Sequence, residues 1–177
     1  MSLVILSRPV WAASDRAWLK ALRDRHGGAY FDPSLGPHLT LVFPVEEVDE
    51  STAVSHVHAA ASDTPPFEAA FRAVLPVKDD FSNDTFLYLV PDQGLSGIVR
   101  LHDRLYTGPL AEALRLDIAY IPHVTLGRFS SARIAKALAD DLNAQDPALT
   151  TRVETVELFR LKQGAPPHRI AEFVLDG

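Results

Sequence analysis

The sequence contains no cysteine among its 177 residues. Disulfides and thiolate metal sites are therefore excluded, and because such a chain suits a reducing compartment we expect a cytoplasmic location. Basic residues are also scarce, since 17 Lys and Arg stand against 23 Asp and Glu, for a net charge of −6. A broad basic surface that wraps a nucleic acid duplex is thus not expected. Any contact with nucleic acid should be local, at an end or a single nucleotide.

Long apolar runs are absent too, and none approaches the ~18 residues that a membrane-spanning helix needs. The N-terminal segment has no basic residues ahead of its short apolar run, and Arg8-Pro9 interrupts that run, so we interpret it as a strand and not as a secretion signal. Glycine-rich dinucleotide-binding and phosphate-loop motifs are missing as well. With 47% hydrophobic and 23% charged residues, the composition predicts one globular domain over residues 1–177.

What the chain does contain is one pentapeptide pattern in two copies, PHLTL at residues 37–41 and PHVTL at residues 122–126. In a β-strand alternate side chains share a face, so each histidine and the threonine two positions later should point the same way. The aliphatic residues between and after them can then be buried in a core. A proline just ahead of each histidine suits the first position of a strand. The repetition suggests two copies of one half-site.

The order of predicted elements repeats along with the motif. Apolar periodicity predicts helices over 15–26, 50–62, 94–107 and from Ser131 onward, and strands over 3–6, 38–44, 67–77, 85–90, 121–129, 151–162 and 168–175. Each half then reads strand, helix, motif strand, helix, strand. Two lobes related by a pseudo-two-fold axis would bring both motif strands to one central groove.

Two histidines that face each other across a groove can act on opposite sides of a reacting centre. Their unperturbed pKa of about 6.5 lets one accept a proton while the other donates one near neutral pH. We therefore assign His38 and His123 as the candidate catalytic pair. The hydroxyls of Thr40 and Thr125 would donate hydrogen bonds from both sides, which suits a group with several oxygens such as phosphate. This chemistry requires no metal and no cofactor.

The repeated H-x-T-x motif resembles that of the 2H phosphoesterase superfamily, especially its 2′-5′ RNA ligase-like branch. The resemblance implies an α+β, bilobed fold with two antiparallel β-sheets around the groove and helices on the outside. It also implies opening of 2′,3′-cyclic phosphates on RNA ends or small nucleotides, with His38 and His123 as acid and base and with Thr40 and Thr125 on the phosphoryl oxygens. In that branch the second histidine is usually the base, but the residues themselves leave the order open. We expect a monomer that contacts neither membrane nor metal.

Two further positions, Phe43 and Arg128, stand five residues after the two histidines, as in many members of that branch. Strict alternation from His123 would turn Arg128 away from the groove. An isolated glycine in a strand often marks a bulge, and a bulge at Gly127 would bring Arg128 back as a phosphate ligand, which is the interpretation that we favour. Phe43 has the parity of the buried leucines of its motif, so we expect it in the core and not stacked on a base.

Several alternatives stay open at this point. The same acid and base could join RNA ends through a 2′-5′ linkage, or the groove could bind nucleotides or RNA without turnover. A metal hydrolase would need a third ligand beside His38 and His123. We interpret His58 and His102 as partly buried structural residues, because they lie on apolar helix stripes. The polar segment 78–84 is either a plain connector or a mobile lid.

Overall fold

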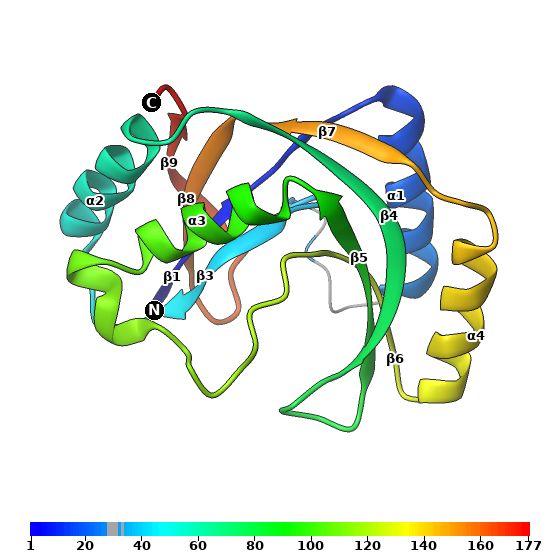
Figure 1. The fold of residues 1–177 in the computed structure, drawn as a ribbon. Helices are drawn as coiled ribbons and strands as arrows, with labels where there is room; N and C mark the ends of the chain where they lie inside the picture. The colour runs from blue at the N-terminus through cyan, green and yellow to red at the C-terminus, as the bar shows by residue number, and fades with distance from the viewer. Residues whose placement is uncertain (28–31, 33) are drawn as a thin grey trace.

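The computed structural model describes residues 1–27, 32 and 34–177, and its ribbon is drawn in Figure 1. Its strands are β1 (Ser2–Ser7), β2 (Val10–Trp11), β3 (Leu39–Val45), β4 (Phe67–Lys78), β5 (Thr85–Gln93), β6 (Val124–Phe129), β7 (Leu149–Val153), β8 (Thr155–Leu161) and β9 (His168–Val174). Its helices are α1 (Ala13–His26), α2 (Glu50–Ser62), α3 (Leu95–Leu105), α4 (Ala132–Asn143) and the 3₁₀ helix η2 (Gly108–Ala113). Within this described part of the chain, no helix is long and apolar enough to cross a membrane.

All of these strands belong to a single nine-stranded sheet with the order β2-β7-β4-β5-β6-β3-β1-β8-β9. Every neighbouring pair is antiparallel. The motif strands β3 and β6 are central neighbours, but they are joined by the one register pair Leu39 and Val124. The α+β antiparallel class is thus confirmed. The two predicted sheets are the two arms of one curved sheet, connected at this bridge.

The predicted repetition of element order is present in the structure. The run β1, α1, β3, α2 in the first half of the chain corresponds to the run β5, α3, β6, α4 in the second half. The helices that precede the motif strands cross over: α1 packs against β6 and α3 packs against β3. Figure 1 shows α2 and α3 at one side of the sheet and α1 and α4 at the other, so each arm is covered by one helix from each half of the chain.

The segment predicted as one strand over 151–162 is two strands in different arms. β7 ends at Val153 and pairs with β4, whereas β8 begins at Thr155 and pairs with β1 and β9. The chain therefore crosses from the second arm to the first at Glu154. Residue periodicity is the same on both sides of such a crossing, so the sequence pattern does not reveal it. The predicted hairpin of the last two strands is confirmed as β8 and β9.

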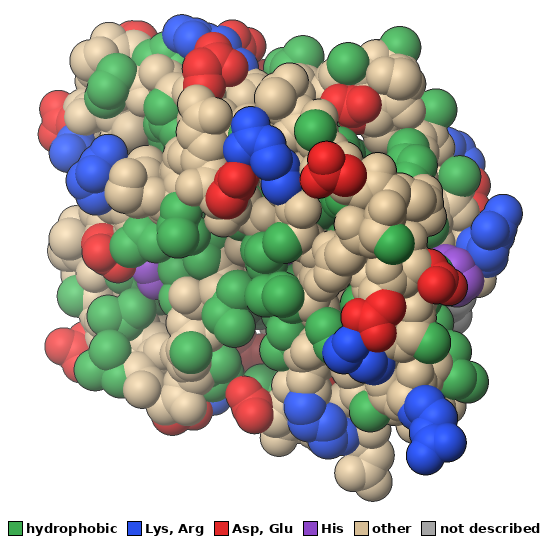
Figure 2. All heavy atoms as spheres, turned by 45° about the vertical axis from the view of Figure 1, so that its right-hand side comes forward, with side chains coloured by type: hydrophobic (Ala, Val, Ile, Leu, Met, Phe, Trp, Pro, Cys, Tyr) green, Lys and Arg blue, Asp and Glu red, His purple; other side chains and the backbone are tan. Residues whose placement is uncertain are grey.

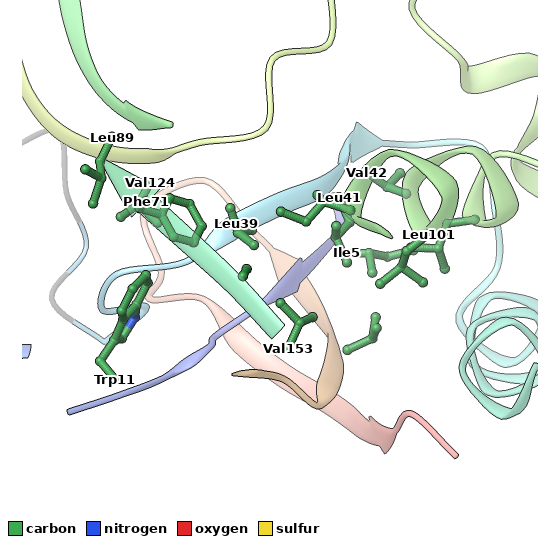
Figure 3. Close-up of a cluster of buried hydrophobic side chains, with 14 of the residues drawn as sticks. Ile5, Trp11, Leu39, Leu41, Val42, Phe71, Leu89, Leu101, Val124 and Val153 are labelled. Carbon is green, nitrogen blue, oxygen red and sulfur yellow. The ribbon is translucent and has the colours of Figure 1, made fainter. Parts of the chain in front are cut away.

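The main hydrophobic core lies between the sheet and its helices, and Figure 3 shows part of it. β1 has both faces buried, because Leu3 and Ile5 point into this core while Val4 and Leu6 join Phe159 in a small separate cluster. An antiparallel strand of a two-layer protein normally leaves its second face to solvent. Here the second face of β1 instead forms an apolar floor beside the groove described below.

Candidate functional site

The four histidine and threonine side chains of the two motifs line one cavity of about 300 Å³. Each histidine immediately precedes its strand, and each threonine is the second residue of β3 or β6. The bridge between the two strands lies at the residues directly after the histidines, so it holds the two motif copies side by side. Other side chains around the cavity are Val4, Leu6, Arg23, Asp32, Leu35, Phe43, Pro44, Phe86, Tyr88 and Leu161.

Both motif strands contain a register shift just after the threonine. In β3 the pairing with β1 moves from Thr40 to Val42, and in β6 the pairing with β5 moves from Thr125 to Gly127. Two consecutive residues are buried in each strand as a result, and the alternation of faces is inverted at the next residue, Phe43 in β3 and Arg128 in β6. The bulge expected at Gly127 is therefore present, and an equivalent one occurs in β3 where no glycine marks it.

The inverted alternation decides where Phe43 and Arg128 lie. Phe43 lines the cavity, so the expectation that it belongs to the core is wrong; Val42 takes the core position instead, with no exposed surface. Arg128 lies in an adjoining hollow that shares the His123 side chain with the first cavity. Its Nε donates a hydrogen bond to Asp84 at 2.6 Å. Both positions thus border the groove, one on each motif strand.

Gly127 is also required for packing between α1 and β6. A Cβ atom at this position would lie 2.9 Å from Cβ of His26 and 2.9 Å from Cε2 of Phe129. Real side chains do not approach that closely, so any larger residue would push the end of α1 away from the sheet. The glycine serves both the bulge and the contact that brings α1 to the cavity.

The two catalytic candidates have matching hydrogen bonds. Nδ1 of His38 lies 3.0 Å from the carbonyl oxygen of Gly36, and Nδ1 of His123 lies 2.6 Å from that of Ile121. A carbonyl only accepts, so each ring carries its proton on Nδ1 and keeps the lone pair on Nε2. The His123 ring also stacks on Tyr88, with centroids 3.4 Å apart and planes at 12°. Both rings are therefore fixed in tautomer, and His123 is fixed in plane as well.

Burial lowers the pKa of both histidines. The pKa of His123 falls to about 4, because desolvation outweighs the hydrogen bond to Ile121, and nearby His38 lowers it further. Desolvation also lowers the pKa of His38, with a smaller decrease from the charges of Arg23 and Arg8, while the Gly36 carbonyl and, more weakly, Glu157 raise it. Both rings are therefore neutral at pH 7, a state suited to a general base.

The lowered pKa of His123 predicts a loss of stability in weak acid. Between about pH 6.5 and pH 4 the unfolded chain binds a proton at this histidine that the folded chain does not, so the free energy of unfolding falls as the pH falls through that window. The loss amounts to at most about 3 kcal/mol, since the ring is partly exposed and solvent screens its charge. We expect urea unfolding from pH 7.5 to pH 4.5 to show a shallower pH slope for His123→Gln than for the wild type. His58→Gln is the matched control, and equal slopes for wild type and His123→Gln would contradict the assignment.

Three side chains take over the hydrogen bonds of β3 where it diverges from β6. His102 Nδ1 donates to the Leu41 carbonyl at 2.7 Å, and Tyr120 Oη donates to the Thr40 carbonyl at 3.0 Å. Tyr106 Oη accepts from the Phe43 N–H at 3.0 Å. The His102 ring stacks on Tyr120 at 3.6 Å and meets Tyr106 edge-on. These hydrogen bonds satisfy backbone groups of β3, and the His102 side chain is buried, so His102 is structural, as expected.

His58 differs from expectation, because its side chain is exposed on α2 and contacts Phe173 at 5.7 Å between ring centroids.

Arg23 and Tyr88 are cavity residues that the sequence analysis missed. Arg23 on α1 is 8% exposed, and its side chain reaches the cavity beside His38. The sequence does indicate that Arg23 is buried, because Arg23 stands four residues after Leu19 and so occupies the buried stripe of the helix. Tyr88 pairs in register with Thr125 on the neighbouring strand. No local pattern indicates that pairing.

Buried charge near His38 extends to Glu157, which is 1% exposed. Its carboxylate binds Arg8 in a two-point ion pair and Arg169 at 2.8 Å, so the negative charge of Glu157 is paired with two arginines.

No metal site is found among the described residues, which contain no group of three or more His, Cys, Asp or Glu side chains placed to hold an ion. The third ligand that a metal hydrolase would need is therefore not found in this part of the chain.

Comparison with known proteins places these features in a family. Residues 9–165 match the model of a family described as the 2′-5′ RNA ligase superfamily. A putative phosphoesterase of Geobacillus thermodenitrificans (strain NG80-2) is 29% identical over 94 residues, which are 52% of this chain and 51% of that protein. The match thus spans about half the length of that relative.

Two solved structures share the fold across their whole length. LigT of E. coli, crystallised with 3′-AMP, has a TM-score of 0.62 and 18% identity, with 99% of this chain and 98% of that chain covered. TT0787 of Thermus thermophilus has a TM-score of 0.64 and 22% identity, with 100% and 99% covered. At such identities the likeness establishes the curved two-armed architecture.

Proposed function

Because this chain belongs to the 2′-5′ RNA ligase superfamily, we propose that it is a metal-independent phosphoesterase that opens 2′,3′-cyclic phosphates of RNA ends or small nucleotides. The observation that carries the proposal is the meeting of both His/Thr pairs in one cavity. Each histidine is held by the same kind of hydrogen bond, from Nδ1 to a carbonyl two residues earlier. Such a pair offers one basic nitrogen on each side of a bound phosphorus.

In the proposed reaction His123 is the base and His38 is the acid. The low pKa of His123 keeps its Nε2 unprotonated, so it can take a proton from water as the water oxygen attacks phosphorus. The P–O bond to one ribose oxygen then breaks, and protonated His38 gives that oxygen its proton. His38 acquires the proton when the substrate binds, because the negative phosphodiester raises the pKa of a neighbouring imidazole. One water is consumed, and a phosphate monoester is formed.

The remaining groups hold the phosphoryl oxygens in place. The hydroxyls of Thr40 and Thr125 approach from the two motif strands and would donate hydrogen bonds to the non-bridging oxygens as charge grows there. Arg128 adds a positive charge from the adjoining hollow. LigT of E. coli has been crystallised with phosphate and with 3′-AMP, and this supports a phosphate site in the shared fold.

The distribution of charged side chains favours a short contact with nucleic acid over a long one. On the face drawn in Figure 2, basic and acidic side chains are interspersed among hydrophobic ones and form no continuous basic stripe. A protein that wraps a duplex or a long strand needs such a stripe. Together with the net charge of −6, this face favours binding of the end of an RNA or of a small nucleotide.

Incubation with nucleoside 2′,3′-cyclic phosphates tests the proposal directly. We expect a single monoester product, a bell-shaped pH–rate profile and rates that are unaffected by a chelator, since two histidines supply acid and base. Abolition of activity by chelator would replace this proposal with a metal hydrolase. Binding without turnover across the whole panel would favour a non-catalytic nucleotide-binding module.

Ligation is the second candidate, and the family description favours it specifically. The same acid and base would act with a ribose hydroxyl in place of water. RNA halves that carry a 2′,3′-cyclic phosphate and a free 5′-hydroxyl separate the two activities. Formation of a 2′-5′ linkage at a rate above hydrolysis would assign the chain as a ligase.

A further inference from the structure

A second hollow of about 570 Å³ continues the catalytic cavity on the side of the second arm. The two spaces share the side chains of Phe43, Pro44, Phe86, Tyr88 and His123, so they form one groove. We propose that the substrate fills both: the chain acts on a cyclic phosphate at the end of an oligonucleotide, and the nucleotide next to the terminal one binds in the second hollow. This inference rests on the proposed function.

The walls of the second hollow carry the chemistry that a nucleotide unit requires. Phe81 is 72% exposed, and the Arg115 guanidinium lies 5.5 Å from the centre of its ring. Phe86 stacks on Tyr88 at 6.2 Å, and Arg128 lies 5.8 Å from the Phe86 ring centre. Phe86 is buried, with 6% of its surface exposed, so the exposed Phe81 is the ring that we expect to stack on a base. Arginine adds a cation for the phosphodiester.

The acidic residues in this region keep the guanidinium groups in place. Arg115 Nε donates to Asp117 at 2.7 Å, and Arg128 is bound to Asp84. The Arg115 pair is at the surface, with side chains that are 42% and 63% exposed. Exposed pairs of this kind contribute about 0–1 kcal/mol, so a phosphate can compete for the arginine at little cost.

The segment 78–84, which the sequence left open as connector or lid, forms one wall of the second hollow. Lys78 Nζ donates to the Ser82 carbonyl at 2.8 Å, and the Asp79 N–H donates to the Asp84 carbonyl at 3.0 Å. These bonds give the segment a defined shape. The segment presents Phe81 at its tip toward Arg115, which lies in the loop that follows η2.

Among the described residues, the other surfaces next to the catalytic cavity suit a phosphodiester chain less well. Away from the second hollow, the catalytic cavity is lined by the apolar side chains of Val4, Leu6, Leu35 and Leu161, with Arg23 and Asp32. Beyond Pro44 a neighbouring hollow is lined by Glu46, Glu47 and Glu112 against Arg115, so its net charge is negative and repels phosphate. In the second hollow the acidic Asp79 and Asp80 are outnumbered by Lys78, Arg115 and Arg128. These linings favour a path for the nucleotide chain from the histidines toward Phe81 and Arg128.

The test compares two substrates that share the same terminal base: a nucleoside 2′,3′-cyclic phosphate and a dinucleotide that ends in the same cyclic phosphate. We expect the wild type to prefer the dinucleotide by about 10-fold or more in kcat/KM, because one additional base is stacked. Phe81→Ala should lower this preference by about 10-fold, and Arg115→Gln should lower it less. The control is Leu95→Ala, an exposed hydrophobic residue at the start of α3, which should keep the preference.

Each outcome bears on a different claim. Equal kcat/KM for the two substrates in the wild type, or a preference that survives Phe81→Ala, would overturn the second subsite while the proposed function stands. Failure to hydrolyse either substrate would remove the proposed function and this inference with it. Phe81 is exposed, so the variant is expected to fold, and its melting temperature should match that of Leu95→Ala.

Discussion

Replacing either His38 or His123 by alanine is expected to lower turnover of a 2′,3′-cyclic phosphodiester by about 10²–10⁴-fold, the usual contribution of one general acid or base. The reason is that both rings line the same cavity and each supplies one proton transfer. Circular dichroism and melting temperature at pH 7 should remain near those of the wild type, because neither ring belongs to the main core. Initial rates with a cyclic nucleotide measure the effect.

A change of leaving group distinguishes the acid from the base. A phosphodiester that releases nitrophenolate needs no proton on its leaving oxygen, so the acid variant should recover most of its activity while the base variant should not. With His38 as acid, we expect the defect of His38→Ala to shrink to within about 10-fold on this substrate. The His123→Ala defect should persist.

His58→Ala serves as the control, since that histidine is exposed and lies outside the cavity. Full hydrolysis by the double variant His38→Ala, His123→Ala would refute the catalytic assignment altogether. Recovery of His123→Ala instead of His38→Ala on the nitrophenolate substrate would reverse the two roles and leave the mechanism otherwise intact.

Leu39→Ala removes no catalytic group, but we expect it to lower both stability and turnover. Leu39 is 1% exposed, and it forms the bridge with Val124 that joins the two arms of the sheet. Removal of a buried leucine side chain costs about 2–5 kcal/mol of unfolding free energy. Because the cavity left behind lies directly beside His38, we also expect kcat to fall by ~10-fold or more, since small misplacements of catalytic groups are costly.

Leu149→Ala separates the two effects, because Leu149 is 5% exposed and lies in β7, away from the motif strands. Urea unfolding should show similar losses of stability for both variants. Rates measured well below both melting temperatures should fall for Leu39→Ala alone. If Leu39→Ala kept the wild-type kcat, the bridge would not be what sets the distance between the two histidines.

The sequence predicts the features of the site that depend on local patterns of a few residues. The repeated PHxTL motif identified His38 and His123, and alternation placed each threonine on the histidine side. A lone glycine pointed to the bulge that carries Arg128 to the groove. The matching bulge in β3 has no such marker, since Leu41 and Val42 look like an ordinary apolar pair, and for that reason Phe43 was assigned to the wrong face.

The chain by itself determined which side chains come in pairs, which strands carry them and in what order the elements follow, because these properties depend on neighbours a few residues apart. Tertiary structure decided that the two arms meet at one bridge, that the chain changes arms at Glu154, and that Tyr88 and Arg23 reach the histidines. Register between strands and the packing of a helix on a distant strand depend on partners far along the chain. The periodicity of the sequence contains no information about these long-range contacts, so they can be read only from the tertiary structure.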